Sequence, residues 1–231
     1  MQIAMEEVNK ENRKEDLPEV EMGIGIHTGQ VVLGNIGSPE RMKYGVVGSN
    51  VNLTSRIQAC TIGGQILVSE TTRQEVGNRL KIGKQMEVRA KGVEHPVVLF
   101  EALGIGGRHK LSLGETTDTL IELEEEIPLR YEVVESSQVG GALSKGVLTK
   151  VSLKAAEARL ANSVPVLSNL KMHLIRSDGE QIAGSLYGKV LGPVSGTSNG
   201  VSIRFTSISP EIEAVLRRVI AEESPVVGSD P

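Results

Sequence analysis

Two polar side chains that could face a phosphate, Asn52 and Arg56, stand four residues apart in YGVVGSNVNLTSR, residues 44–56. Four residues make about one turn of an α-helix, so an amide and a guanidinium at this spacing project from the same face. Gly48 allows a sharp turn before that helix, whose first N–H groups and positive dipole end favour an anion. The pattern therefore predicts a phosphate-facing pair. An ordinary strand-turn-helix with a surface arginine and a capping asparagine is the alternative.

The surrounding sequence, GIGIHTGQVVLGNIGSPERMKYGVVGSNVNLTSRIQ at residues 23–58, resembles the C-terminal half of the class III adenylate/guanylate cyclase catalytic domain. The resemblance continues through GGQILVSETTRQEV and AKGVEHPVVLFEALG. It implies that Asn52 and Arg56 hold the ribose and the transition-state phosphoryl group, and that Lys91 binds the triphosphate of a nucleoside triphosphate. Gly45 falls at the base-recognition position, where base-reading members have Asp or Thr, so the choice between ATP and GTP is not predicted.

Cyclization in this family uses two metal ions held by two aspartates, which neutralise charge and position the reacting groups. In the family these aspartates lie upstream of the first residue matched here. None of the aspartates in this chain falls at such a position; they are Asp16, Asp118, Asp178 and Asp230. We expect Mg²⁺ or Mn²⁺ to bind only if a partner cyclase chain supplies the aspartates, and the chain to be inactive by itself.

The elements that must position these residues follow from periodicity and turn signals. The expected fold of residues 1–107 is α+β, a partial ferredoxin-like cyclase sheet with helices on one face. His27 is interpreted as a structural strand residue, because no partner for a catalytic base is close in sequence. The expected elements are a helix at 2–14, a glycine-rich hairpin of strands 21–27 and 30–35, a strand at 42–47, a helix at 50–60, a strand at 65–69 followed by a short helix capped by Ser69, and paired strands at 79–88 and 95–102.

The composition of the chain changes around the glycine-rich stretch GIGGRHKLSLGE, which indicates a flexible segment, and we place a linker at residues 108–115. Beyond it, short strand-like runs with glycine, serine and asparagine breaks predict a small antiparallel β-barrel at 116–222. A helix over 210–220 is expected to cover this barrel, and residues 223–231 are expected to be a disordered tail. The predicted strands are 119–123, 129–135, 146–153, 169–175, 182–191 and 200–206.

This second part resembles a PilZ domain, the bacterial receptor module for cyclic di-GMP, in its strand rhythm and in GVSIRFTSISPEIEAVLRRVI. Members that bind the dinucleotide carry two arginines four residues apart and an Asp/Asn-x-Ser-x-x-Gly strand. Here Arg130 is followed four residues later by Val134, and the strand KVSLKA keeps only Ser152. The resemblance implies Arg130 and Ser152 as remnants of a ligand site, and we expect cyclic di-GMP to bind weakly.

Composition limits the remaining possibilities. A net charge of −4 and a pI near 5.7 give no reason to expect a nucleic-acid binder. The single Cys60 excludes an intrachain disulfide and indicates a reducing compartment. No apolar run approaches the roughly 20 residues of a membrane span, and the charged N-terminus is unlike a signal peptide, so a cytoplasmic location is expected.

The favoured function is nucleotide second-messenger signalling by a cyclase fragment that needs a partner chain or self-association. The rival interpretation is a non-catalytic regulatory or interaction module in which the barrel senses a ligand of the cyclic di-GMP type. A truncated product of a longer gene is the third possibility.

Overall fold

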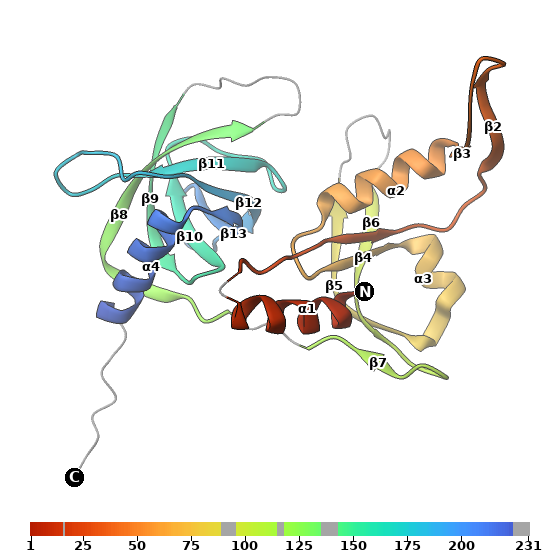
Figure 1. Ribbon diagram of the computed structural model, residues 1–231. Helices are drawn as coiled ribbons and strands as arrows, with labels where there is room; N and C mark the ends of the chain where they lie inside the picture. Colours follow the sequence, from red (N-terminus) through yellow and green to blue (C-terminus); the bar gives the residue numbers. More distant parts are fainter. Residues whose placement is uncertain (16, 89–95, 115–117, 135–142, 224–231) are drawn as a thin grey trace, which may run out of the picture. The chain divides into compact units, whose positions relative to one another are not determined.

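The computed structural model describes residues 1–15, 17–88, 96–114, 118–134 and 143–223. The chain divides into two compact units, Met1–Glu115 and Thr116–Pro231 (Figure 1). The first unit mixes helices and strands, and the second is a barrel with one helix. The predicted tail lies almost entirely in residues outside the described ranges.

The first unit contains three α-helices and seven strands in its described residues. In chain order they are α1 (Gln2–Lys14), β1 (Ile24–Ile26), β2 (Val32–Ser38), β3 (Arg41–Val47), α2 (Ser49–Cys60), β4 (Ile66–Ser69), α3 (Glu70–Val76), β5 (Leu80–Val88), β6 (Val97–Ile105) and β7 (Leu111–Ser112), with a 3₁₀ turn at Gly77–Arg79.

The main sheet of this unit has the strand order β1-β4-β6-β5, with β7 added beside β6. β1 runs parallel to β4, whereas the other pairs are antiparallel. Helices lie on both faces and not on one. Leu99 packs in the cluster that includes Ile57 of α2, while Arg73 of α3 lies over the ring of Phe100. The expectation of one covered face is wrong because Leu99 and Phe100, adjacent on β6, point to opposite faces and both need cover.

The glycine-rich hairpin has a different partner from the one expected. β2 pairs with β3 across the turn at residues 39–40, and these two strands form a separate two-stranded sheet. β1 instead pairs with β4, with Ile24 opposite Ile66. A three-residue apolar strand buries more surface beside β4, whose Leu67 is completely buried, than beside the exposed strand β2. A strand does form near the predicted residues 30–35, but it pairs with β3 and not with the strand that precedes it.

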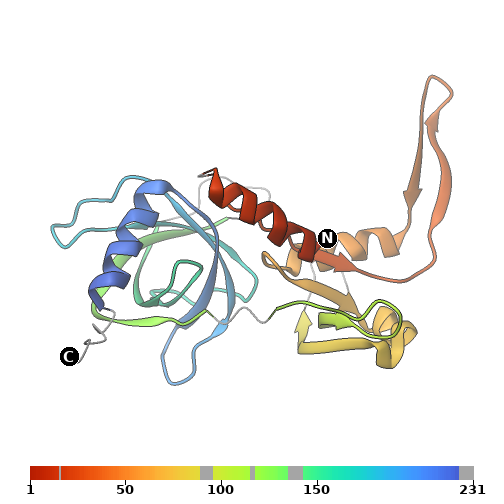
Figure 2. The ribbon, with the colours of Figure 1, turned by 60° about the horizontal axis from the view of Figure 1, so that its bottom comes forward.

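The second unit is a closed six-stranded barrel with the order β10-β13-β12-β11-β8-β9, followed by a helix (Figure 2). Its core is apolar and includes the fully buried Leu148, Leu170 and Ile203. Helix α4 contributes Ile212 and Leu216 to that core. The elements are β8 (Ile121–Val134), β9 (Ser144–Val151), β10 (Ala155–Leu160), β11 (Asn169–Leu174), β12 (Leu186–Pro193), β13 (Gly200–Ile208) and α4 (Pro210–Glu223).

The barrel and its closing helix are confirmed, but two strand assignments differ from expectation. The runs predicted at 119–123 and 129–135 join into the single strand β8, with an irregularity between Glu122 and Ile127. β10, with the sequence AAEARL, was not predicted because alanine, glutamate, arginine and leucine all favour helix. Its Ala156, Ala158 and Leu160 face the core, so packing between β9 and β13 overrides local preference.

Within the described parts of the chain, no helix is both long and apolar enough to cross a membrane.

Candidate functional site

Helix α2 presents Asn52 and Arg56 beside its buried face. Ile57, which is 1% exposed, and the partly buried Leu53 pack with Leu67 and Leu99 of the sheet. Asn52 is exposed and Arg56 is half-buried. The predicted helix and the one-turn spacing of the amide and the guanidinium are therefore present, next to the side of the helix that packs in the core.

The turn before α2 depends on Gly48. Its φ of +151° lies in a region that side-chain-bearing residues rarely adopt. The carbonyl of Gly48 accepts hydrogen bonds from the N–H groups of Val51, at 3.1 Å, and Asn52, at 3.3 Å. Among the residues that the structure describes, no side chain caps the start of the helix. The first N–H groups of α2 thus remain directed out of the helix end, as an anion site would require.

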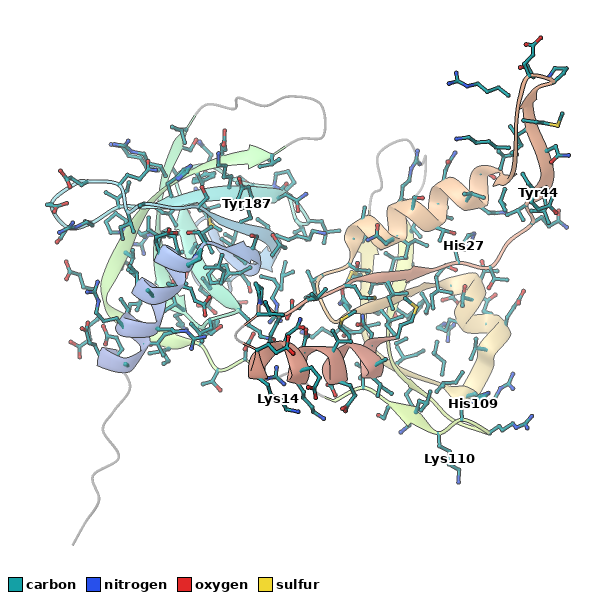
Figure 3. All side chains as sticks on the ribbon, viewed as in Figure 1. Lys14, His27, Tyr44, His109, Lys110 and Tyr187 are labelled. Carbon is teal, nitrogen blue, oxygen red and sulfur yellow. The ribbon has the colours of Figure 1, made fainter. Side chains whose placement is uncertain are left out.

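A polar network that the sequence did not reveal holds the start of α2. Nδ2 of Asn50 donates to the carbonyl of Gln30 at 2.8 Å, which turns Oδ1 toward Nε2 of His27 at 3.1 Å. The ring hydrogen is then on Nε2, so Nδ1 accepts from the hydroxyl of Ser69 at 2.8 Å. Figure 3 shows His27 between α2 and α3.

This network gives His27 a structural role. Ser69 is 3% exposed, and its oxygen also accepts from the N–H of Thr72 at 3.3 Å, so it caps α3 as predicted. His27 therefore joins the end of β1 to the starts of two helices. Its partners lie 23 and 42 residues away in the sequence, which is why no local pattern could show them.

A hollow of about 690 Å³ lies beside this network. His27, Leu53 and Phe100 line it, together with Glu70 and Arg73. The guanidinium of Arg73 donates to both carboxylate oxygens of Glu70, at 2.9 and 2.6 Å. These hydrogen bonds lower the pKa of the Glu70 carboxyl and raise the pKa of Arg73.

Two other residues, Lys91 and Gly45, were predicted to contribute to the cyclase site. Lys91 lies outside the described residues. Gly45 lies on β3 opposite Gly34, and a side chain added to Gly45 would make an ordinary 3.5 Å contact with Ile36. The backbone therefore has room for a Cβ at this position.

Arg130 and Ser152 do not come together. Arg130 lies opposite Lys145 on β9, and Ser152 follows the end of that strand seven residues later, a distance of about 23 Å at about 3.3 Å per residue. The oxygen of Ser152 accepts from the N–H groups of Lys154, at 3.1 Å, and Ala155, at 2.9 Å. Its hydroxyl organises the turn between β9 and β10, so these two residues do not share one pocket.

The described residues contain no group of three or more His, Cys, Asp or Glu side chains placed to hold a metal ion. The side chains described around α2 therefore do not fit the two-metal arrangement that the cyclase resemblance implies.

Comparison with known proteins relates the first unit to nucleotide cyclases. Residues 1–101 match the model of the Adenylate and Guanylate cyclase catalytic domain. The match confirms that this part of the chain has cyclase homology. It covers the three α-helices, strands β1 to β5 and the first part of β6, including the whole of α2.

The similar adenylate cyclases are much longer than the segment over which they match this chain. Adenylate cyclase 1 of Rhizobium meliloti (strain 1021) is 30% identical over 103 residues, which cover 44% of this chain and 16% of that protein. The adenylate cyclase of Anabaena cylindrica is 32% identical over 110 residues, covering 44% of this chain and 22% of that protein. The guanylyl cyclase Cya2, in its crystal structure, shares 50% sequence identity with this chain and has a TM-score of 0.46. The similarity covers 49% of this chain and 57% of the Cya2 chain. The chain thus spans about a fifth of the length of the two adenylate cyclases.

Proposed function

We propose that this protein acts in nucleotide second-messenger signalling, and that its first unit contributes the transition-state half of a cyclase active site. The observation that carries the proposal is the geometry of α2. Asn52 and Arg56 lie one turn apart on a helix, beside the side that is fixed in the core and inside a segment with cyclase homology. Lys91, on the sequence resemblance alone, would bind the triphosphate of the same nucleotide.

The two side chains have complementary chemistry for this role. The guanidinium of Arg56 would donate to oxygens of the phosphoryl group as negative charge develops on it, and the amide of Asn52 would hold the ribose. Such electrostatic stabilisation is usually the largest single contribution to catalysis. The chain supplies donors only, so ATP or GTP would be cyclized once a partner chain brings two metal-binding aspartates with Mg²⁺ or Mn²⁺.

Two surfaces support association with such a partner. β1 lies at the end of its sheet, so one edge of this strand has no neighbouring strand among the described residues. Strand edges of this kind recruit other chains. The hairpin β2–β3 exposes large apolar side chains, among them Leu33 at 58% and the Tyr44 labelled in Figure 3 at 71%. A cluster of exposed apolar residues marks an interaction surface.

The test is complementation. The full chain is mixed with a cyclase from the same family that keeps its metal aspartates but lacks its own Asn and Arg, and cyclic-nucleotide formation from ATP and from GTP is measured. We expect no activity from the chain alone, measurable activity from the mixture, and loss of that activity with Arg56→Ala. Removing one such stabilising group lowers kcat on the order of 10²- to 10³-fold. Gln58→Ala, an exposed change on the same helix, is the matched control.

Each arm of this experiment can contradict the proposal. Turnover by the chain alone would refute the need for a partner's aspartates. Activity of the mixture that survives Arg56→Ala would refute the role of that arginine, and absence of activity in every mixture would refute the shared active site.

The exposed hairpin also favours a second candidate, a non-catalytic regulatory module that binds a cyclase-like partner without joining its chemistry. In that case the chain would change the activity of an intact partner cyclase while Arg56→Ala left the change unaltered. Substituting Leu33 by lysine on the hairpin would abolish the change, because a charge there opposes apolar docking.

A further inference from the structure

Residues of β8, β9 and β10, which run side by side in the barrel, line a hollow of the second unit. Its volume is about 530 Å³, inside the range of about 300–1,000 Å³ typical of small-molecule sites. Three basic side chains line it, Arg130, Lys145 and Arg159, together with the apolar Pro128 and Ile175. The hollow thus combines positive charge with apolar surface.

The strand register concentrates the charge. Arg130 of β8 is directly opposite Lys145 on β9 and directly opposite His173 on β11. Leu129 and Tyr131 beside Arg130 are both buried in the barrel, so Arg130 points outward because strand side chains alternate. Directly opposite residues have Cβ atoms about 4.5–5.5 Å apart, and like charges at that distance destabilise a sheet.

Nearby carboxylates do not relieve this repulsion. Glu126 accepts hydrogen bonds from Arg159 at 2.9 and 2.7 Å, and Glu132 lies 3.6 Å from Lys171. Within the described parts of the chain, no carboxylate comes within ion-pair distance of Arg130 or Lys145. Among the described residues, the two adjacent cations that line the hollow are therefore available to bind an anion.

We propose that this hollow binds a small organic phosphate, a phosphate ester with an apolar body. Arg130 and Lys145 would contact the phosphate, because guanidinium and ammonium groups form strong charge-assisted hydrogen bonds with its oxygens. Pro128 and Ile175 would contact the body of the ester. The site uses neither a residue of α2 nor Ser152, so it can be tested independently of the cyclase proposal.

Calorimetry on the full chain tests the site with phenyl phosphate, inorganic phosphate and phenol as probes. Phenyl phosphate is expected to bind more tightly than either fragment, because it alone satisfies both the cations and the apolar surface. Arg130→Gln and Lys145→Gln should each weaken its binding about tenfold or more, as expected for loss of one charge-assisted contact. Arg218→Gln, an exposed change of the same charge on α4, should leave binding unchanged.

Thermal unfolding without ligand separates binding from structure. Arg130→Gln should melt at the wild-type temperature or above it, since the change removes a like-charge contact, while phenyl phosphate should raise the melting temperature of the wild type only. The proposal is overturned if phenyl phosphate gives no binding at millimolar concentration. It is equally overturned if inorganic phosphate binds as tightly, or if the two lining variants bind like the Arg218→Gln control.

Discussion

Replacing Gly25 by alanine tests whether the sheet sets the position of α2. A Cβ added at Gly25 would lie 2.4 Å from the backbone nitrogen and 2.7 Å from the Cα of Gln58 on that helix. Ordinary contacts begin at 3.4 Å, so the helix has to move by about 1 Å. Backbone atoms cannot rotate away as a flexible side chain would. The displacement therefore reaches Asn52 and Arg56 on the same helix.

The expected cost follows from this overlap. Overpacking of this kind destabilises a domain by about 1–3 kcal/mol, which lowers the melting temperature by roughly 4 °C or more for a unit of this size. A misplacement of about 1 Å at catalytic groups reduces turnover by roughly 100-fold. We expect Gly25→Ala to lower both the melting temperature and the activity restored in the complementation mixture.

Circular dichroism melting and the complementation assay measure the two effects. Gly114→Ala, in the same unit but outside the hairpin β2–β3, is the matched control, because a Cβ there meets nothing within 4 Å. The control should melt and complement like the wild type. If Gly25→Ala also behaves like the wild type in both assays, the close approach of β1 to α2 is refuted, and with it the argument that the sheet fixes the candidate catalytic pair.

Three other outcomes are expected. At tens of micromolar the full chain should sediment as an assembly, and Leu33→Lys should shift it toward monomer without lowering its melting temperature; a monomeric wild type would contradict this. Cyclic di-GMP should bind weakly, because each missing arginine contact costs roughly ten- to a hundredfold in affinity, and a submicromolar dissociation constant by calorimetry would disprove it. The lowered pKa of Glu70 means that its pair with Arg73 stabilises the fold at pH values above 4.5, the ordinary pKa, and that this stabilisation is lost as the pH falls through the lowered pKa. Melting temperatures measured across this pH range should therefore fall less steeply on acidification for Glu70→Gln than for the wild type.

Local signals were enough to predict much of the first unit. Gly48 and the four-residue spacing of Asn52 and Arg56 predicted α2 and the one-turn separation of these two side chains. Ser69 was predicted as a helix cap, and its oxygen does accept from the N–H of Thr72. These features depend on residues within one turn of each other, so the sequence contains all the information that they require. The strand rhythm of the second half likewise predicted a barrel, because turns recur at short intervals.

Contacts between distant residues could be found only in the folded structure. The pairing of β1 with β4, the bonds of His27 with Asn50 and Ser69, and the register that places Arg130 opposite Lys145 each join segments that no short pattern connects. β10 shows the reason, since its composition favours a helix and the burial gained between β9 and β13 decides otherwise. The sequence thus determined which local elements form, and it predicted which residues could meet a phosphate. The tertiary structure decided which edges and faces those elements share, because burial and strand pairing are properties of neighbours that only folding brings together.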